Sequence, residues 1–390
     1  MKHRIVVLGA GYAGASAAGR LARRLHSGDT DITLVNAEPD FVERVRMHQL
    51  AAGQDLKPRP LADMFDGTGV RLRLSRVTAV DVERKTVALD DGELDYDTLV
   101  YALGSAAADH GVPGVAEHAH DVSGRASALR LRDRLTRMDA GGTVTVVGAG
   151  LTGVEAASEI AESRPDLRVA IVARGGFGDW LSPKGRRHLK GAFDRLGVAV
   201  HEHADVTRVE PGTVVTADGR TVPAEAAVWT AGFAVHPIAT ATGLETAESG
   251  QIVVDRTMRS VSHRDVYAVG DAALAEGPGG RPLRMSCASG TPTAWQAADA
   301  IAARLTGRRL PKVPIRYFNQ CISIGREDGL IQFVTADDRA KPYVLKGKKA
   351  ARYKEAICKV AAWGVANPTL GMPARRRHFA HGGAEAAVAA

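Results

Sequence analysis

The chain has 390 residues, and this length predicts two or three domains because a single hydrophobic core rarely serves so long a chain. A composition of 45% hydrophobic and 24% charged residues is typical of a folded globular protein and excludes an intrinsically disordered one. A net charge of +7 could attract nucleic acid or anionic lipid, but the basic residues are dispersed and aromatic residues make up only 5%, so we expect no nucleic-acid partner.

Targeting and cysteine patterns favour a cytoplasmic protein. The N-terminus runs directly into a predicted strand without the apolar run of a signal peptide, and no stretch approaches the roughly 20 apolar residues of a membrane span. Cys287, Cys321 and Cys358 are far apart and odd in number, so we expect neither a disulfide framework nor a bound metal.

The first predicted unit is a strand, a glycine turn and a helix. A β-branched strand from Arg4 leads into Gly9-x-Gly11-x-x-Gly14, followed by a helix over residues 15–25 and a strand over 31–36. In such a turn the first glycine allows the tight bend, the second lets the backbone approach a pyrophosphate, and the third lets the helix pack on the strand. The pattern predicts a dinucleotide site, although unrelated α/β folds also contain glycine-rich turns.

The same unit recurs later in the chain. A strand starting at Thr143 leads into Gly148-x-Gly150-x-x-Gly153, then a helix over residues 154–162 and a strand over 168–172. Two copies in one context argue against a chance glycine turn and predict two dinucleotide-binding folds. Alternating residues over 69–103 and 198–230 predict antiparallel strands inserted before the chain returns to each sheet.

The last third contains weaker signals. We expect strands over residues 252–254 and 266–269, a helix over 291–305, and a linker over 311–314. A β pattern over residues 319–334 and a helix over 347–363 follow, and the tail after Gly382 is expected to fray.

Three further segments carry a family resemblance. Residues 96–105 and 226–233 resemble the strand and turn by which flavoproteins with two dinucleotide folds leave each nucleotide sheet, and residues 257–271 resemble their segment ending in Gly-Asp. Over residues 2–310 the chain resembles the FAD-dependent pyridine nucleotide-disulfide oxidoreductases, and within them the type II NADH dehydrogenases. The resemblance implies an α/β fold with two Rossmann-type domains of the glutathione reductase kind, the second inserted in the first, and a small α+β C-terminal domain.

The resemblance also implies domain bounds and cofactor contacts. The FAD-binding domain would span residues 1–108 and 238–312, the NAD(P)H-binding domain 109–237, and the C-terminal interface or acceptor domain 313–390. The residues it assigns to FAD are Gly9, Gly11, Tyr12, Ala13, Gly14, Asn36, Ala37, Arg44, Val77, Ala102, Gly104, Gly270, Asp271, Thr293 and Ala294. Those it assigns to NAD(P)H are Gly148, Gly150, Leu151, Thr152, Gly153, Glu155, Arg174, Ala231 and Gly232.

Individual roles follow from the same resemblance, each with a plainer alternative. Asp271 would hold the flavin ribityl and pyrophosphate region, or serve as a helix cap. Glu155 would lie near the nicotinamide ribose and flavin, or simply interact with its helix dipole. His48 could donate a proton to an acceptor, with Gln49 beside it, or be structural. Gln296 would belong to a quinone pocket.

The ribose positions leave the nicotinamide cofactor open. In the first copy, Asn36 or Glu38 can bond a ribose hydroxyl. In the second copy, Ala173 replaces the usual acid and Arg174 follows it, which slightly favours the 2′-phosphate of NADPH over NADH, with Arg186 and Arg187 as helpers.

Two features depart from the relatives. Neither Cys-x-x-Cys nor Cys-x4-Cys occurs, which disfavours a thiol relay, and we expect Cys287 and Cys321, the only candidates for sulfide chemistry, to be small buried residues. Quinone-reducing members carry two glutamines four residues apart before the final helix, but Pro292 occupies the position that would pair with Gln296.

A basic stretch over residues 346–365 carries Tyr353, Ile357, Val360 and Trp363 at helical spacing, with basic residues 375–377 beyond it. Such a helix can lie on a membrane surface, but docking on its own domain or on the partner of a homodimer explains it as well and is preferred.

The sequence therefore predicts an enzyme that passes a hydride from NAD(P)H to FAD and then electrons to an acceptor, in the first place a quinone or quinone-like compound. Delivery to a small protein such as ferredoxin, and oxidation or reduction of a specific metabolite, are the alternatives. A non-catalytic redox sensor is a further, less favoured one.

Overall fold

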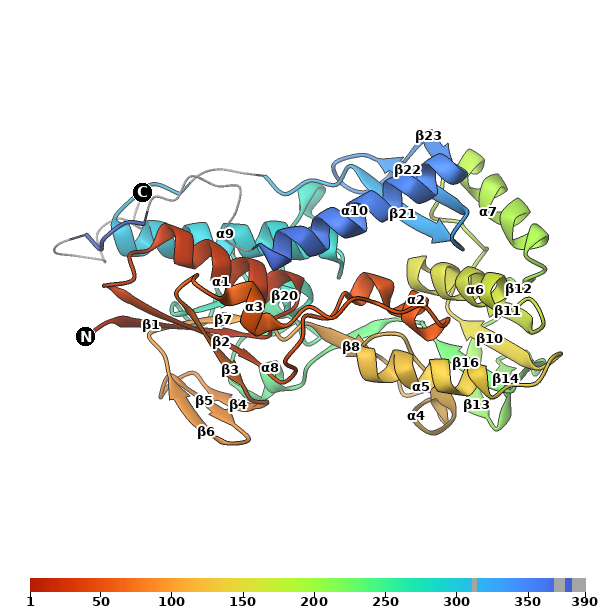
Figure 1. Ribbon diagram of the computed structural model, residues 1–390, viewed down its shortest axis with the longest axis horizontal. Coiled ribbons are helices and arrows are strands. Elements are labelled where there is room, and N and C mark those ends of the chain that lie inside the picture. Colours follow the sequence, from red (N-terminus) through yellow and green to blue (C-terminus); the bar gives the residue numbers. More distant parts are fainter. Residues whose placement is uncertain (311–313, 368–375, 381–390) are drawn as a thin grey trace.

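The computed structural model describes residues 1–310, 314–367 and 376–380 (Figure 1). Its first sheet has five parallel strands, in the spatial order β19 (Val266–Ala268), β7 (Thr98–Tyr101), β1 (His3–Leu8), β2 (Thr30–Asn36) and β3 (Val70–Leu74). Two long helices, α1 (Tyr12–Arg24) and α9 (Cys287–Thr306), lie side by side on one face of this sheet. The central strands are almost fully buried, as expected for a parallel sheet covered on both faces.

The second sheet repeats this plan between β7 and β19 of the first. Its strands, in spatial order, are β12 (Ala199–His201), β11 (Arg168–Val172), β10 (Thr143–Val147), β16 (Ala226–Trp229) and β9 (Ala119–His120). Helices α5 (Arg125–Thr136), α6 (Leu151–Ser163) and α7 (Pro183–Arg195) surround it. Because the chain leaves the first sheet, completes the second and then returns, the second dinucleotide fold is inserted in the first.

Smaller sheets decorate and connect these two. One antiparallel sheet contains β4 (Val77–Asp81), β5 (Thr86–Leu89) and β6 (Gly92–Asp95), and another contains β13 (Val206–Glu210), β14 (Gly212–Thr216) and β15 (Thr221–Ala224). The two crossing segments between the large sheets pair with each other as β8 (Ser105–Ala107) and β17 (Phe233–Val235), and β18 (Ile252–Val253) pairs with β20 (Ala273–Leu274). The short helices are η1 (Arg44–Arg46), α2 (Met47–Ala51), α3 (Leu61–Phe65), α4 (Val115–His118), α8 (Ile238–Ala241), η2 (Gly270–Ala272) and η3 (Pro278–Gly280).

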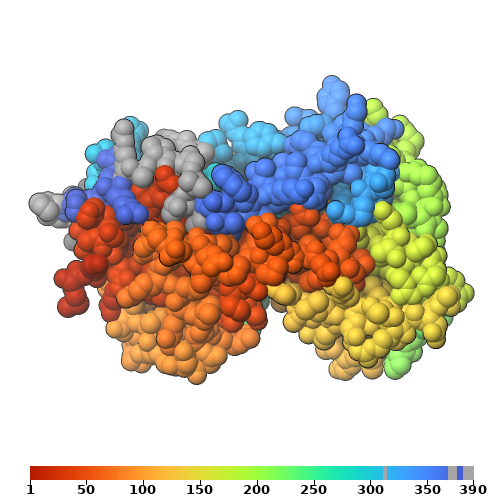
Figure 2. All heavy atoms as spheres, viewed as in Figure 1, coloured from red at the N-terminus to blue at the C-terminus, as the bar shows by residue number. Residues whose placement is uncertain are grey.

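The C-terminal part forms a third layer. An antiparallel sheet of β21 (Asn319–Ile324), β22 (Asp328–Val334) and β23 (Ala340–Lys346) is followed by α10 (Lys348–Ala366). In Figure 2 the blue α10 runs as a band above the orange N-terminal part, from the third sheet toward the first dinucleotide fold. This layer contacts α6 through β21 and α1 through α10, so it covers parts of both dinucleotide folds.

Several predicted elements have different bounds or partners. The first two helices begin at Tyr12 and Leu151, three residues earlier than expected, because Gly11 and Gly150 are their N-caps. The helix expected from residue 291 begins at Cys287. Val70–Leu74 and Ala199–His201, expected in antiparallel insertions, instead extend the two parallel sheets.

Within the described part of the chain, no helix is both long and apolar enough to cross a membrane. Residues 311–313 of the predicted linker and the tail after Gly382 lie outside the described residues.

Candidate active site

The two glycine turns have the same backbone packing. A Cβ added to Gly14 would lie 1.8 Å from the carbonyl oxygen of Gly9, and one added to Gly153 would lie 1.8 Å from that of Gly148. By contrast, a Cβ added to Gly11 would meet no atom of the described residues within 4 Å. The outer glycines are thus required by the protein's own packing, whereas the middle glycine borders open space. This is the arrangement that a pyrophosphate at the helix N-terminus needs.

Beside the first turn lies a polar cluster built on Asp271. Ser105 Oγ donates a hydrogen bond to Asp271 Oδ2 at 2.7 Å, and Arg44 Nη1 lies 3.3 Å from the same oxygen and donates to Ser105 Oγ at 3.0 Å. Burial lowers the pKa of Arg44, with Asp271 opposing that shift. Arg44 Nη2 is buried without a hydrogen-bond partner among the described residues. A buried, unpaired guanidinium nitrogen fits a site that holds an anionic group such as the FAD pyrophosphate.

Other residues expected at the FAD are held by the protein itself. Asn36 Oδ1 accepts from the Ala10 N–H at 2.8 Å and its Nδ2 donates to the Glu38 carbonyl at 2.7 Å, so its amide fixes the turn, whereas the side chain of Glu38 is exposed. Thr293 Oγ1 accepts from the Gly270 N–H at 3.1 Å and thereby ties α9 to η2.

An open depression of about 430 Å³ adjoins the end of β2. It is lined by Ala37, Leu74, Ser75, Arg76, Asp90 and Asp91. Val77, also expected at the FAD, begins the next strand and is buried. The depression is at the carboxyl ends of β2 and β3, where parallel nucleotide-binding sheets receive the adenosine part of a dinucleotide.

The remaining FAD residues flank the first turn. Tyr12 packs its ring edge-on against Phe41, and its hydroxyl is buried without a partner among the described residues. Ala13 faces η2, because a Cβ added to Gly270 would lie 2.9 Å from the Ala13 Cβ. Ala102 is buried beneath Gly9, whereas Gly104 follows in an open, left-handed conformation. Ala294 is fully buried in α9.

On the nicotinamide side, the predicted residues surround the second turn. Leu151 and Thr152 form the partly exposed first turn of α6. The His110 ring bonds the Ala231 carbonyl at 3.2 Å and lies over Gly232, where a Cβ would come within 2.5 Å of its Nε2. The second glycine turn is thus bordered mainly by backbone atoms and small side chains.

The arginines expected at a 2′-phosphate differ in their surroundings. Arg174 and Arg187 are exposed. Arg186 is engaged by the protein, since it pairs with Asp179 at 2.8 Å and Glu202 at 3.2 Å. Arg186 is therefore already neutralised by two carboxylates.

A cluster of ionisable and polar side chains is buried around Glu155. Lys354 Nζ lies 3.0 Å from Glu155 Oε1, which also accepts from the Ser323 N–H at 3.0 Å and from Ser323 Oγ at 3.1 Å. His48 Nδ1 lies 3.9 Å from Glu155 Oε2, and its Nε2 lies 3.4 Å from Ser323 Oγ. Each of these four residues comes from a different element, α2, α6, β21 or α10. We call the group of His48, Glu155, Ser323 and Lys354 the Glu155 centre.

The protonation states in the Glu155 centre follow from burial and pairing. Burial alone would raise the pKa of Glu155, but Lys354, His48 and the Ser323 N–H together hold it below its ordinary value. Burial would lower the pKa of Lys354, but Glu155 raises it above its ordinary value. Burial lowers the pKa of His48 to about 4, so this imidazole is neutral at pH 7. The centre thus holds one buried ion pair beside a neutral histidine.

A second buried carboxyl lies one helical turn farther along α6. Glu159 accepts a hydrogen bond from Gln54 Nε2, and its Oε2 has no partner among the described residues. Arg326 Nε lies 4.0 Å from Glu159 Oε1. Burial raises the pKa of Glu159 to about 7, so this group exchanges its proton near neutral pH.

All three cysteines are free thiols, and burial raises the pKa of Cys321 to about 11 and that of Cys358 above its ordinary value. Thiols with a raised pKa are poor nucleophiles at neutral pH, which supports the expectation that thiol chemistry is disfavoured. Cys358 is buried as expected, but Cys321 is only partly buried and Cys287 is exposed, contrary to the prediction that both are buried residues.

The structure brings together two of the three residues expected to be catalytic, Glu155 and His48. Gln296 is not part of this centre: its Nε2 donates to the Arg256 carbonyl, and its side chain is partly exposed. Sequence reasoning missed Lys354 and Ser323. Lys354 lies in a basic stretch that looks solvated, and Ser323 lies in an ordinary strand, so neither carried a local signal.

Three comparisons place the chain among known proteins. The family model described as pyridine nucleotide-disulphide oxidoreductase matches residues 3–302. An NADH dehydrogenase-like protein of Mycobacterium tuberculosis is 30% identical over 344 residues, covering 83% of this chain and 86% of that protein. A type II NADH:quinone oxidoreductase of Staphylococcus epidermidis is 26% identical, covering 91% of this chain and 94% of that protein.

Among solved structures, the sulfide:quinone oxidoreductase of Aquifex aeolicus superposes with a TM-score of 0.79 at 20% identity, covering 96% of this chain and 93% of that one. Such a likeness confirms the predicted fold of two dinucleotide-binding domains. Because the family model covers more than half of the sequence, the chain belongs to the pyridine nucleotide-disulphide oxidoreductase family and is an oxidoreductase.

Proposed function

We propose that the protein is an NADH dehydrogenase that binds FAD at the first glycine turn, binds NADH at the second, and reduces a quinone. The observation that carries the proposal is the buried ion pair of Glu155 with Lys354, located at the start of the helix that follows the second glycine turn. The names of the mycobacterial and staphylococcal relatives support NADH as the electron donor, and that of the staphylococcal relative supports quinone as the acceptor.

The residues suited to hold FAD are those of the first turn together with Arg44 and Asp271. Their fit rests on the open space at Gly11 and on the unpaired buried nitrogen of Arg44. When bound, FAD supplies a ring that accepts a hydride from a nicotinamide and passes two electrons to a second substrate.

Ionisable side chains on and around the Glu155 centre bear on the proton that quinone reduction needs in addition to the hydride. Reduction of a quinone to a quinol consumes two electrons and two protons, whereas the hydride of NADH brings two electrons and one proton. The other proton must therefore reach the site from solvent through ionisable side chains. Glu159, whose pKa of about 7 lets it exchange its proton near neutral pH, is suited to pass it on. Lys354 is not the donor, because Glu155 raises its pKa and the ion pair holds that proton in place. Because His48 is neutral at pH 7, its ring has one N–H and one lone pair, so it can relay a proton but does not hold the extra proton of an imidazolium ion.

Engagement of Arg186 by Asp179 and Glu202 leaves only the exposed Arg174 and Arg187 to attract a 2′-phosphate. We therefore favour NADH over NADPH, contrary to the slight preference for NADPH that Ala173 and Arg174 suggested.

The outer side of α10 supports contact with a membrane that contains the quinone. Tyr353, Ile357, Val360 and Trp363 are all exposed, between 37% and 65% of their surface, while the same helix docks on the protein through Ala350, Cys358, Ala362 and Val365. The apolar stripe is thus not explained by docking on its own domain. A flotation assay with anionic and neutral vesicles tests this, with the Ile357→Ser/Trp363→Ser double variant expected to lose binding. A shift in the measured oligomeric state of that variant instead would assign the stripe to a homodimer.

The function is tested by anaerobic stopped-flow spectroscopy of the purified flavoprotein. We expect NADH to bleach the visible flavin band faster than NADPH does, and a short-chain quinone to restore it within the turnover time. If bleaching is fast but only ferredoxin or oxygen restores the band, the quinone assignment is wrong while the dehydrogenase half stands. Flavin that neither nucleotide bleaches contradicts the whole proposal.

A further inference from the structure

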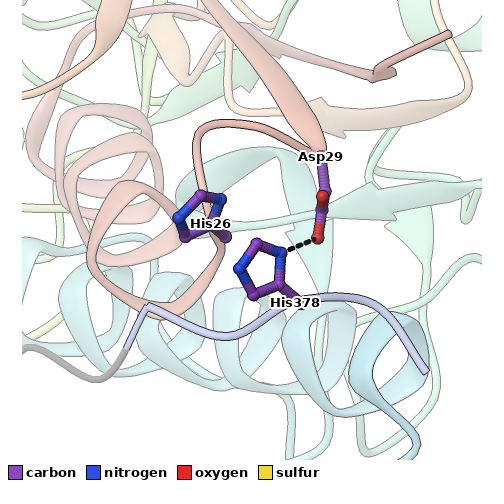
Figure 3. Close-up of side chains that lie close together, drawn as sticks. All are labelled: His26, Asp29 and His378. Carbon is purple, nitrogen blue, oxygen red and sulfur yellow. Dashed lines mark hydrogen bonds and ion pairs between the residues drawn. The ribbon is translucent and has the colours of Figure 1, made fainter. Parts of the chain in front are cut away.

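Two further groups of ionisable side chains differ in how fully their polar atoms are paired. At the edge of the first dinucleotide fold, His26, Asp29 and His378 lie together (Figure 3). Asp29 Oδ2 bonds His378 Nδ1 at 3.0 Å and accepts a backbone N–H, and His26 Nδ1 accepts another, so this group is held by its own hydrogen bonds. The second group lies on α6 beyond Glu155, and there one buried carboxyl oxygen of Glu159 has no partner among the described residues.

Strand β21 and the turn that follows it run along one face of α6. Three backbone N–H groups of this hairpin each donate to a polar side chain of the helix: Ser323 to Glu155 at 3.0 Å, Gly325 to Ser158 at 3.1 Å, and Arg326 to Glu162 at 2.7 Å. Glu159 lies among these side chains. Its Oε1 accepts from Gln54 Nε2, whereas its Oε2 is the buried oxygen without a partner in the described part of the chain. The hairpin therefore fixes the neighbours of Glu159 and leaves Oε2 able to carry a proton.

Three carboxyl groups follow one another along this face of α6. Glu155 and Glu159 are four residues apart and Glu159 and Glu162 are three apart, spacings that bring Cβ atoms of a helix within about 5–6 Å of one another. A single water between neighbouring carboxyls spans such a gap. Glu155 and Glu159 are 7% and 1% exposed, and Glu162 is partly exposed. The series thus leads from the Glu155 centre to the protein surface.

We propose that these three glutamates are the route by which protons enter for quinone reduction, with Glu162 at the mouth, Glu159 as the reservoir and Glu155 at the inner end. This inference rests on the proposed function. The step is a proton transfer alone: Glu159 Oε2 releases a proton toward Glu155 and becomes a carboxylate, and water at Glu162 returns one proton for each quinone reduced. The second proton of the quinol is the one that the hydride brings.

The charge around Glu159 suits a group that must both hold and release a proton. Burial raises the pKa of Glu159 to about 7, with Arg326 of the β21–β22 turn opposing the shift and Glu162 and Glu155 of the same helix adding to it. Arg326 Nε lies 4.0 Å from Glu159 Oε1, and its Nη2 lies 3.8 Å from Glu355 of α10. Arg326 therefore limits how far the pKa rises, so that both forms of Glu159 are present near neutral pH, as a relay requires.

The kinetic test is reoxidation of the reduced flavin by a short-chain quinone, followed by anaerobic stopped flow between pH 5 and pH 9. In the parent, the rate should fall above about pH 7, as Glu159 loses its proton. Glu159→Gln should slow reoxidation at least 10-fold at pH 6 and abolish this inflection. Glu159→Asp, which keeps a carboxyl, should restore part of the rate together with an inflection. NADH should still bleach the flavin of both variants.

A change of Arg326 should move the inflection without removing it. Arg326→Gln takes away the cation that favours the carboxylate of Glu159, so the inflection should shift to higher pH, while the backbone bond to Glu162 remains. Arg195→Gln is the matched control, because Arg195 pairs with Asp328 of the same hairpin at 2.9 Å and should leave the inflection in place. An Arg326→Gln profile identical to that of the parent would contradict the assignment of the inflection to Glu159.

The mouth of the route is tested with Glu162→Gln. In dilute buffer this variant should reoxidise more slowly than the parent, and a higher buffer concentration should relieve the deficit, because a dissolved acid then replaces the missing carboxyl. Parent rates in dilute buffer would remove Glu162 from the route.

Infrared titration of the flavoprotein without substrate gives a readout that is independent of turnover. The carbonyl stretch of a protonated carboxylic acid should appear as the pH falls through about 7 and should be absent from Glu159→Gln. Its absence from the parent would overturn the route. A parent that quinone does not reoxidise contradicts the proposed function, whereas a parent that turns over while Glu159→Gln keeps both rate and inflection overturns the route alone.

Discussion

The two dinucleotide folds share one backbone plan, yet equivalent positions on their helices do different things. Two residues after the third glycine, α1 has Ser16 and α6 has Glu155; six residues after it, α1 has Arg20 and α6 has Glu159. Arg20 pairs with Asp299 of the covering helix α9, which is a purely structural contact. Glu155 and Glu159 instead face β21, α10 and the segment after α2, which contribute Ser323, Lys354 and Gln54 respectively. The repeat therefore produces two similar glycine turns for binding dinucleotides. The elements packed on the following helix, α1 or α6, decide which of the two turns has buried ionisable groups beside it.

The largest expected effect tests what the two folds share. Gly14→Ala and Gly153→Ala each place a Cβ 1.8 Å from a backbone oxygen, which no rotamer can relieve, so we expect a loss of about 5 kcal/mol or failure to fold. Gly11→Ala and Gly150→Ala are the controls, because a Cβ there meets nothing in the described protein. Freed of cofactor, they should unfold in calorimetry at the temperature of the parent apoprotein, while Gly11→Ala should bind FAD more weakly and Gly150→Ala should bind NADH more weakly. A stable Gly153→Ala would show that the two turns are not equivalent.

The next effect concerns the buried ion pair of Glu155 with Lys354, which has no counterpart at Ser16, the equivalent position of the first fold. Lys354→Met leaves Glu155 buried without its partner, which should destabilise the protein by about 3–5 kcal/mol in urea unfolding. Adding Glu155→Gln should recover most of that loss, because no unpaired charge then remains. Lys359→Met, at an exposed position of the same helix, is the matched control.

The kinetics of the same variants separate folding from function. In Lys354→Met/Glu155→Gln, NADH should still bleach the flavin, whereas reoxidation by quinone should slow at least 10-fold. Unchanged reoxidation would remove the Glu155 centre from the acceptor reaction.

A smaller effect is expected at Glu159, the counterpart of Arg20. Its folded pKa of about 7 lies above the value of about 4.3 of an unfolded chain, so between these values the folded state holds a proton that the unfolded state has lost. This contribution is complete below about pH 4.3 and disappears as the pH rises through about 7. Glu159→Gln, which resembles the protonated acid, should stabilise the protein above pH 7 by roughly 1–3 kcal/mol. It should also flatten the dependence of melting temperature on pH, and an unaltered slope from pH 5 to 8 would contradict the prediction.

The smallest effect compares the serines of the two folds. Ser323→Ala removes a hydroxyl donor to the ionised Glu155 and should cost about 1.5–3 kcal/mol, whereas Ser16→Ala, in a buried position of α1, should cost less than about 1 kcal/mol. Thermal unfolding at pH 7 distinguishes them. Equal losses would mean that the hydroxyl of Ser323 contributes packing alone.

The two glycine turns could be predicted from the sequence, whereas the Glu155 centre could be predicted only in part. Strand Arg168–Val172 has the predicted bounds because β-branched residues between turn residues leave little ambiguity. Glycine spacing similarly identifies positions where a backbone must approach another atom closely. Lys354 and Ser323 could not be found this way, because they reach Glu155 through contacts spanning more than 160 residues of sequence.

The missed and misplaced strands have local causes. Strand β23, Ala340–Lys346, lacks a clear alternation because most of its residues are exposed, and it contains Pro342. Strands β3 and β12 lie at the edges of their parallel sheets, where short segments look alike whether they extend the sheet or begin a hairpin.

The position of Lys354 in the chain has a consequence for synthesis. Glu155 is made early, but its counter-charge is carried by α10, near the end of the described sequence, and α10 also contacts α1 of the first fold. A ribosome-bound chain that has emerged only as far as α9 has both glycine turns and Asp271, but its Glu155 still lacks the cover of β21 and α10 and the counter-charge of Lys354. Nucleotide capture can therefore precede turnover, and a translational stop or proteolytic cut before α10 should yield a protein that binds its cofactors yet passes no electrons on.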